Sequence, residues 1–182
     1  MSKLLGRRLA SILCVSMLGV GMIGVQPAHA LAGGITLEFS INVTLNPFPC
    51  NGVPCALPAA AGTFTGGGAD VAQPGIVYGP FVGNAFNLTG GTYHEPDCYS
   101  GTASGTFAAV GLGGGNFSYT RVGATAVLIV SITPANGKKY TGAGLAAFVA
   151  NGGNFAADCA PITGTQGAMN AMVTGAVVVA NP

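Results

Sequence analysis

Hydrophobic and polar residues alternate strictly over a stretch near the start of the chain. The apolar positions of this stretch are Ile35, Leu37, Phe39, Ile41, Val43 and Leu45. The residues between them are Thr36, Glu38, Ser40, Asn42 and Thr44. A period of two is expected of a β-strand that buries one face and exposes the other to water. We therefore predict a strand over residues 35–45.

Further strand-like runs follow, separated by glycine, proline and asparagine. They cover residues 76–82, 85–89, 102–110, 116–122, 124–133, 140–149 and 168–179. The segments Gly111–Asn116 and Ala135–Gly137 are expected to form hairpin turns, because glycine and asparagine readily adopt positive φ. No run after residue 30 has a helical period. The pattern predicts an all-β fold, an antiparallel β-sandwich or a β-barrel with short glycine-rich hairpin turns, and leaves both open.

The first thirty residues have the composition of a secretory signal peptide. The basic residues at the start are Lys3, Arg7 and Arg8. An apolar run over residues 9–25 follows, and Ala28-His29-Ala30 then supplies the small residues of a cleavage site. An uncleaved membrane anchor is the alternative, since the run is nearly long enough to span a bilayer. We predict that residues 1–30 are removed and that residues 31–182 form a single disulfide-bonded β domain, secreted and extracellular.

Removal of this segment changes the charge of the chain. The full sequence has a formal net charge of +1. The basic residues that remain are Arg121, Lys138 and Lys139, against Glu38, Asp70, Glu95, Asp97 and Asp158. Three basic and five acidic residues leave a net charge of −2. Because no basic patch exists, the sequence indicates no nucleic-acid partner and no membrane contact after removal of the signal.

Four cysteines remain after residue 30, an even number that predicts two disulfides in an exported chain. The segments 86–102 and 148–165 resemble one another, since each contains Gly-Gly, an aromatic residue, Asp-Cys and Gly-Thr in that order. Two similar loops lying side by side would pair Cys98 with Cys159 and leave Cys50 to pair with Cys55. The cysteine spacing does not match a zinc ribbon or finger, so no metal is predicted.

The segment His94-Glu95-Pro96-Asp97 is the candidate catalytic site. Histidine carries protons near neutral pH, and the two neighbouring carboxylates suit acid–base chemistry or weak metal binding. The structural alternative is a polar loop in which His94 and Glu95 are solvated, Asp97 caps a turn and Tyr93 is buried. We favour the structural interpretation, because nothing nearby fixes a nucleophile or an oxyanion donor.

Arg121 and Tyr119 are the candidate binding residues, and they share one face of a predicted strand with Phe117. Arg121 could hold a ligand carboxylate or sulfate, since the guanidinium group binds such anions through two parallel hydrogen bonds. The alternative is internal: the arginine stacks over the tyrosine and forms an ion pair with one of the five acids.

These observations favour a secreted non-catalytic β domain that binds an extracellular ligand or a cell-surface component, with no cofactor. The chain has no tryptophan and no Gly-x-Ser-x-Gly motif, which disfavours sugar binding and serine hydrolysis. The apolar run 126–130 suits an assembly role, because it would aggregate at an open sheet edge. Two alternatives remain: a small secreted hydrolase that uses His94 with nearby carboxylates, and a small apolar-ligand carrier with a barrel pocket.

Overall fold

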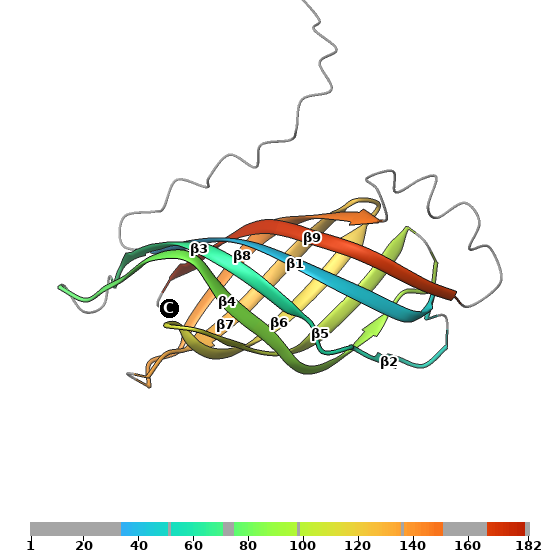
Figure 1. Ribbon diagram of the computed structural model, residues 1–182, viewed down its shortest axis with the longest axis horizontal. Coiled ribbons are helices and arrows are strands. Elements are labelled where there is room, and N and C mark those ends of the chain that lie inside the picture. The colour runs from blue at the N-terminus through green and yellow to red at the C-terminus, as the bar shows by residue number, and fades with distance from the viewer. Residues whose placement is uncertain are drawn as a thin grey trace, which may run out of the picture.

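A computed structural model of the protein describes residues 34–50, 52–70, 75–97, 99–135, 137–150 and 167–180. These residues form nine β-strands (Figure 1). The strands are β1 (Ile35–Phe48), β2 (Cys55–Ala56), β3 (Ala61–Ala69), β4 (Val77–His94), β5 (Ser100–Ala109), β6 (Gly113–Val122), β7 (Thr125–Thr133), β8 (Tyr140–Ala150) and β9 (Gly167–Ala180). In the described ranges, no helix is long and apolar enough to cross a membrane.

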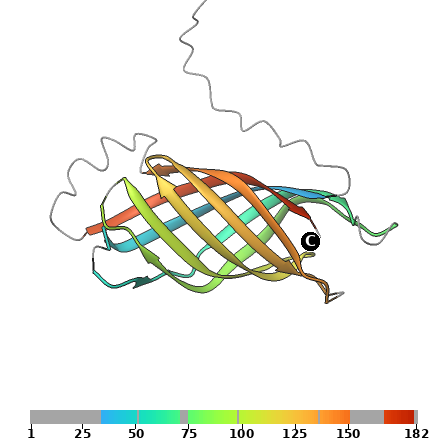
Figure 2. The ribbon, with the colours of Figure 1, turned by 180° about the vertical axis from the view of Figure 1, so that it is seen from behind.

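The strands form one antiparallel sheet that closes into a barrel. Their order is β4-β3-β1-β9-β8-β7-β6-β5, and β5 pairs back onto β4. Figure 1 shows β1 and β9 running side by side along one wall, and Figure 2 shows strands β6 to β8, yellow to orange, on the opposite wall. The predicted all-β fold is confirmed, and of the two predicted architectures the barrel is the one formed.

Strand β4 connects the two halves of the barrel. Residues 77–87 pair with β3 on one edge, and residues 86–94 pair with β5 on the other edge. The short β2 pairs with the end of β4, beyond Ala61, the first residue of β3. The prediction of two separate strands over 76–82 and 85–89 was wrong, because the chain continues as one strand through Gly83 with a φ of 65°. Strand β3 was not predicted.

The alternation in β1 is confirmed. Ile35, Leu37, Ile41 and Leu45 are all at most 7% exposed and face the interior, whereas Glu38 on the opposite face is exposed. The other strands also turn apolar side chains inward, so the closed sheet surrounds an apolar core. Closure of the sheet removes the edges that an antiparallel sandwich would leave open.

The core consists of two clusters of buried side chains, one toward each end of the barrel. We call the first the disulfide end: Leu45, Phe48, Cys50, Tyr93, Tyr119, Ala126, Ala146, Phe148, Met169 and Ala171. We call the second the Asp70 end, because that acid lies beside it: Ile35, Leu37, Phe64, Phe81, Leu112, Val130, Ile132, Tyr140, Val177 and Val179. Strand β2 marks the disulfide end in Figure 1.

Three aromatic rings inside the barrel lie close to glycines on neighbouring strands. The cross-strand pairs are Gly62 with Phe86, Gly105 with Phe117, and Gly115 with Phe107. A Cβ atom added at Gly105 would lie 3.1 Å from the Phe117 ring, and one at Gly115 would lie 2.9 Å from the Phe107 ring. The glycines therefore give these rings room to lie along the inner wall.

Hairpin turns lie at both expected places, but the first is shorter than predicted, because residues 113–116 belong to β6. Gly111, between β5 and β6, has a φ of 78°, and Gly137, between β7 and β8, has a φ of 76°. Both values lie in the region that glycine adopts at little cost. Strand β7, which contains the apolar run 126–130, pairs with β6 on one edge and β8 on the other. That run is therefore not an open edge, and the support it gave to an assembly role is lost.

Candidate functional site

A cavity of about 160 Å³ lies inside the barrel. Phe39, Phe117 and Leu128 line it, and these three side chains also pack against the clusters of both ends. The cavity therefore lies between the two clusters, in the middle of the barrel. The same three side chains are only half-buried, although they face inward, because the space between them is not filled by protein.

The size and lining of the cavity suit a small apolar molecule. Its lining consists almost entirely of Leu, Ile, Val, Phe and Ala side chains contributed by strands around the barrel. An apolar cavity of about 150 Å³ in a protein core stays dry and binds benzene or xenon. The barrel interior thus has the volume and chemistry to hold a molecule about the size of a substituted benzene.

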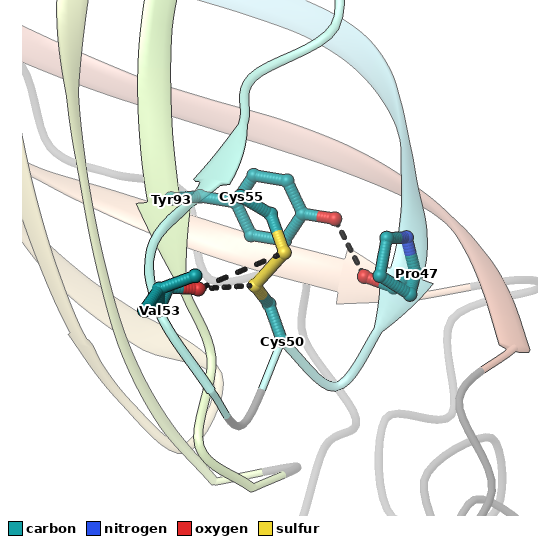
Figure 3. The surroundings of a disulfide bond; sticks show 5 residues. All are labelled: Pro47, Cys50, Val53, Cys55 and Tyr93. Carbon is teal, nitrogen blue, oxygen red and sulfur yellow. Dashed lines mark hydrogen bonds between the residues drawn. A yellow bond between two sulfur atoms is a disulfide. The ribbon is translucent and has the colours of Figure 1, made fainter.

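Polar groups reach the cavity wall from its disulfide end. Among the described lining residues, only Tyr93, Glu95 and Tyr119 carry a polar atom on the side chain. Tyr93 is 2% exposed, which confirms its predicted burial, and its hydroxyl donates a hydrogen bond to the carbonyl oxygen of Pro47 at 2.5 Å (Figure 3). The Tyr93 hydroxyl is thus occupied within the protein, and it fixes the end of β1 against β4.

Glu95 forms a buried ion pair with Arg121. The Arg121 Nη2 and Glu95 Oε2 atoms are 2.5 Å apart, and the two side chains are 0% and 2% exposed. A side chain on Gly101 would overlap the Glu95 carboxylate, so the glycine opposite Arg121 on β5 leaves room for this pair. The expectation that Glu95 is solvated was wrong, because the chain turns it into the barrel one residue after β4 ends.

Arg121 makes two further contacts that hold it in place. Its Nη1 atom donates a hydrogen bond to the carbonyl oxygen of Gly123 at 2.8 Å, and its guanidinium carbon lies 4.8 Å from the centre of the Phe148 ring. The predicted ion pair with an acid is therefore present, whereas the ring beneath the guanidinium is Phe148 and not Tyr119. Because Arg121 does not line the cavity, its contacts are internal to the protein.

Burial shapes the electrostatics of this end. Desolvation raises the pKa of Glu95, and the nearby positive charge of Arg121 partly opposes this rise. Desolvation also raises the pKa of the Tyr119 hydroxyl far above its ordinary value, so Tyr119 stays protonated at any physiological pH. The Tyr119 hydroxyl has no hydrogen-bond partner among the described residues. Since buried polar groups are nearly always hydrogen-bonded, this hydroxyl calls for an explanation.

The three predicted catalytic candidates do not form one site. His94 lies between Tyr93 and Glu95, which both line the cavity, and it pairs with the exposed Thr102 on β5, so it faces outward. Asp97 is exposed and accepts hydrogen bonds at 2.7 Å from the backbone N–H groups of Tyr99 and Ser100.

The backbone hydrogen bond from Tyr99 is the main cause that lowers the pKa of Asp97. The predicted turn cap at Asp97 is therefore confirmed, and its carboxylate lies on the surface while that of Glu95 lies in the barrel. His94, Glu95 and Asp97 thus occupy three different environments within four consecutive positions of the chain.

The disulfide end takes its name from Cys50 and Cys55. Their sulfur atoms are 1.97 Å apart and their Cα atoms 6.2 Å apart, at the disulfide distance that the predicted pairing requires. The bridge closes the loop between β1 and β2 and lies beside the Tyr93 ring (Figure 3). Cys98 and Cys159 lie outside the described residues, so their pairing stays a prediction.

The sequence analysis selected Tyr119 and Arg121 and named a barrel pocket as an alternative, but it did not identify the residues that line the cavity. The signal that could have located it was the apolar side of β1, since every second residue of that strand from Leu37 to Leu45 lines the cavity. Comparison with known proteins found no matching family model, no matching curated protein and no matching solved structure. The functional inference therefore rests on the site.

Proposed function

We propose that this chain is a secreted, non-catalytic carrier that binds a small apolar ligand inside its β-barrel. The observation that supports this function is the apolar cavity of about 160 Å³ between the two core clusters. Ligand sites in proteins are typically concave and apolar, with a few polar groups that orient the ligand. Tyr93, Glu95 and Tyr119 are the polar groups of this cavity.

The separation of the titratable residues favours a carrier over a hydrolase. His94 faces the outside of the barrel, whereas Glu95 is held by Arg121 on the inside. A general base must lie within hydrogen-bond reach of the proton that it abstracts. Because His94 and Glu95 occupy opposite faces of the wall, they cannot act together on one substrate.

The binding test uses toluene and isothermal titration calorimetry. For a ligand of about seven heavy atoms, we expect a dissociation constant roughly in the micromolar to millimolar range. Ala103 and Ala108 lie on the same strand, but Ala103 lines the cavity and Ala108 faces the solvent. Ala103→Leu is expected to weaken toluene binding at least about tenfold by filling space, and Ala108→Leu is the matched control. Absence of binding to the parent protein, or equal binding to both variants, contradicts the proposal.

Export is part of the proposed function and rests on the composition of residues 1–30. Amino-terminal sequencing of protein recovered from the culture medium is expected to begin at Leu31. Recovery of the chain only inside the cell, with residues 1–30 still attached, argues against a secreted carrier while leaving ligand binding to be judged by calorimetry.

A further inference from the structure

The Tyr119 hydroxyl is a buried hydrogen-bond donor beside the cavity. Tyr119 is 9% exposed and lines the cavity, yet its hydroxyl has no hydrogen-bond partner among the described residues. A buried donor that is left unsatisfied destabilises the folded protein. The other lining tyrosine, Tyr93, is different, because its hydroxyl donates to Pro47.

The residues around Tyr119 indicate which polar group of a ligand would suit this part of the cavity. Glu95 and Arg121 both interact electrostatically with the Tyr119 hydroxyl, with opposite effects on its proton affinity. The two charges compensate one another within a 2.5 Å ion pair. An anionic ligand would meet the Glu95 carboxylate, which lines the cavity, whereas Arg121 does not line it. An uncharged head group would bring no uncompensated charge into this apolar interior.

We propose that the ligand is an uncharged molecule with an apolar body and one oxygen acceptor, such as a ketone, an aldehyde or an alcohol. When the ligand binds, a small movement of the Tyr119 side chain lets its hydroxyl donate a hydrogen bond to the ligand oxygen, and the ligand body occupies the space between Phe39, Phe117 and Leu128. This inference rests on the proposed carrier function and names the class of ligand for the same cavity.

The test compares two probes of nearly the same shape, acetophenone and α-methylstyrene, which differ in a carbonyl oxygen and a methylene group. Dissociation constants are measured by calorimetry for the parent, for Tyr119→Phe and for Tyr93→Phe. The Tyr93→Phe variant is the matched control, because its hydroxyl lies at the same cavity but already donates to Pro47. The reported quantity is the ratio of the two constants, since absolute affinities also reflect the different water solubilities of the probes.

We expect Tyr119→Phe to shift this ratio about three- to tenfold in favour of α-methylstyrene, the range for loss of one neutral hydrogen bond. Tyr93→Phe is expected to leave the ratio unchanged. The melting temperature of Tyr119→Phe should be no lower than that of the parent, because the substitution removes a buried hydroxyl without a described partner.

The possible failures can be told apart. If α-methylstyrene binds the parent but the ratio is the same in Tyr119→Phe, the hydrogen bond is refuted while the apolar carrier stands. If benzoate binds the parent more tightly than acetophenone, the uncharged head group is refuted. If neither acetophenone nor α-methylstyrene binds the parent, both this inference and the proposed carrier function are overturned.

Discussion

At the disulfide end of the barrel, Glu95 is buried against the guanidinium of Arg121, whereas at the opposite end the buried Asp70 accepts a hydrogen bond from the Tyr140 hydroxyl. Tyr78 lies beside that second pair, with its hydroxyl 3.5 Å from the Tyr140 hydroxyl. Both ends thus bury a carboxyl group with a partner from a distant strand.

The two ends differ in what they face. Glu95 lines the cavity, but neither Asp70 nor Tyr140 does. The hydrogen bond between Asp70 and Tyr140 therefore links the end of β3 to the start of β8. At the disulfide end, Glu95 also forms part of the cavity wall. Substitution of Asp70 or Tyr140 should therefore change stability alone, whereas substitution of Glu95 should change both stability and binding.

The largest effect is expected from Arg121→Met, which leaves Glu95 buried without its cationic partner. Breaking a buried ion pair on one side typically costs about 3–5 kcal/mol of unfolding free energy. Urea unfolding of the variant beside the parent measures this cost. The double variant Glu95→Gln with Arg121→Met should recover part of the lost stability, because no uncompensated charge remains. A loss below about 1 kcal/mol for the single variant would mean that the pair is effectively solvated.

A smaller effect is expected from Tyr140→Phe at the Asp70 end. The variant loses the hydrogen bond to Asp70, which should lower the unfolding free energy by about 1–3 kcal/mol. Toluene affinity should stay unchanged, because Tyr140 does not line the cavity. Calorimetric titration of the folded variant checks the second point. A variant with weakened toluene binding would show that both ends, and not one, are coupled to the cavity.

The third prediction concerns pH and compares Glu95 with Asp97. Burial raises the folded-state pKa of Glu95, so its contribution to stability is full below the unfolded-state pKa and is lost as pH rises through the folded-state pKa. Backbone hydrogen bonds lower the pKa of Asp97, so its contribution is present above the unfolded-state pKa and is lost as pH falls through the folded-state pKa.

Urea unfolding between about pH 3 and pH 7 tests both signs. Relative to the parent, Glu95→Gln should lose a contribution to the unfolding free energy that decreases as pH rises. Asp97→Asn should lose a contribution that increases as pH rises. The Asp97 contribution should be the weaker one, because that carboxylate is exposed. Equal pH profiles for the parent and Glu95→Gln would refute the assigned direction for the buried acid.

The smallest effect is expected from His94→Ala. The side chain faces the outside of β4 between two inward residues, so its removal should change the unfolding free energy by less than about 0.5 kcal/mol. Its toluene affinity should equal that of the parent. Thermal unfolding and calorimetry check the two statements, and a tenfold loss of binding in this variant would place His94 in the site after all.

The local pattern predicted the fold class but not the closure of the sheet. The alternation in β1 was sufficient to predict that strand, whereas β3 has four glycines among its nine residues and gives no such signal. Gly62 of this strand leaves room for the Phe86 ring on the neighbouring strand, where a side chain would collide with it. The pairing of β4 with β5 distinguishes a barrel from a sandwich, and no stretch of sequence read alone contains it.

The candidate site could be predicted only in part for the same reason. Tyr119 and Arg121 were selected because they lie two positions apart and therefore share one face of a strand. The partner of Arg121 was not identified, because Glu95 is 26 positions away and looks like a loop residue in the sequence. In the sequence, His94, Glu95 and Asp97 lie within four positions and suggest a single site. Because β4 ends at His94, the three side chains point in different directions.

Crystallography under xenon pressure tests the existence of the apolar cavity most directly, since xenon enters dry apolar cavities of about this size. We predict a xenon atom inside the barrel in contact with Phe39, Phe117 and Leu128, and none in Ala103→Leu if the added side chain fills the space. A parent crystal with xenon only on its outer surface, and with the barrel interior closed by side chains, would contradict the carrier function.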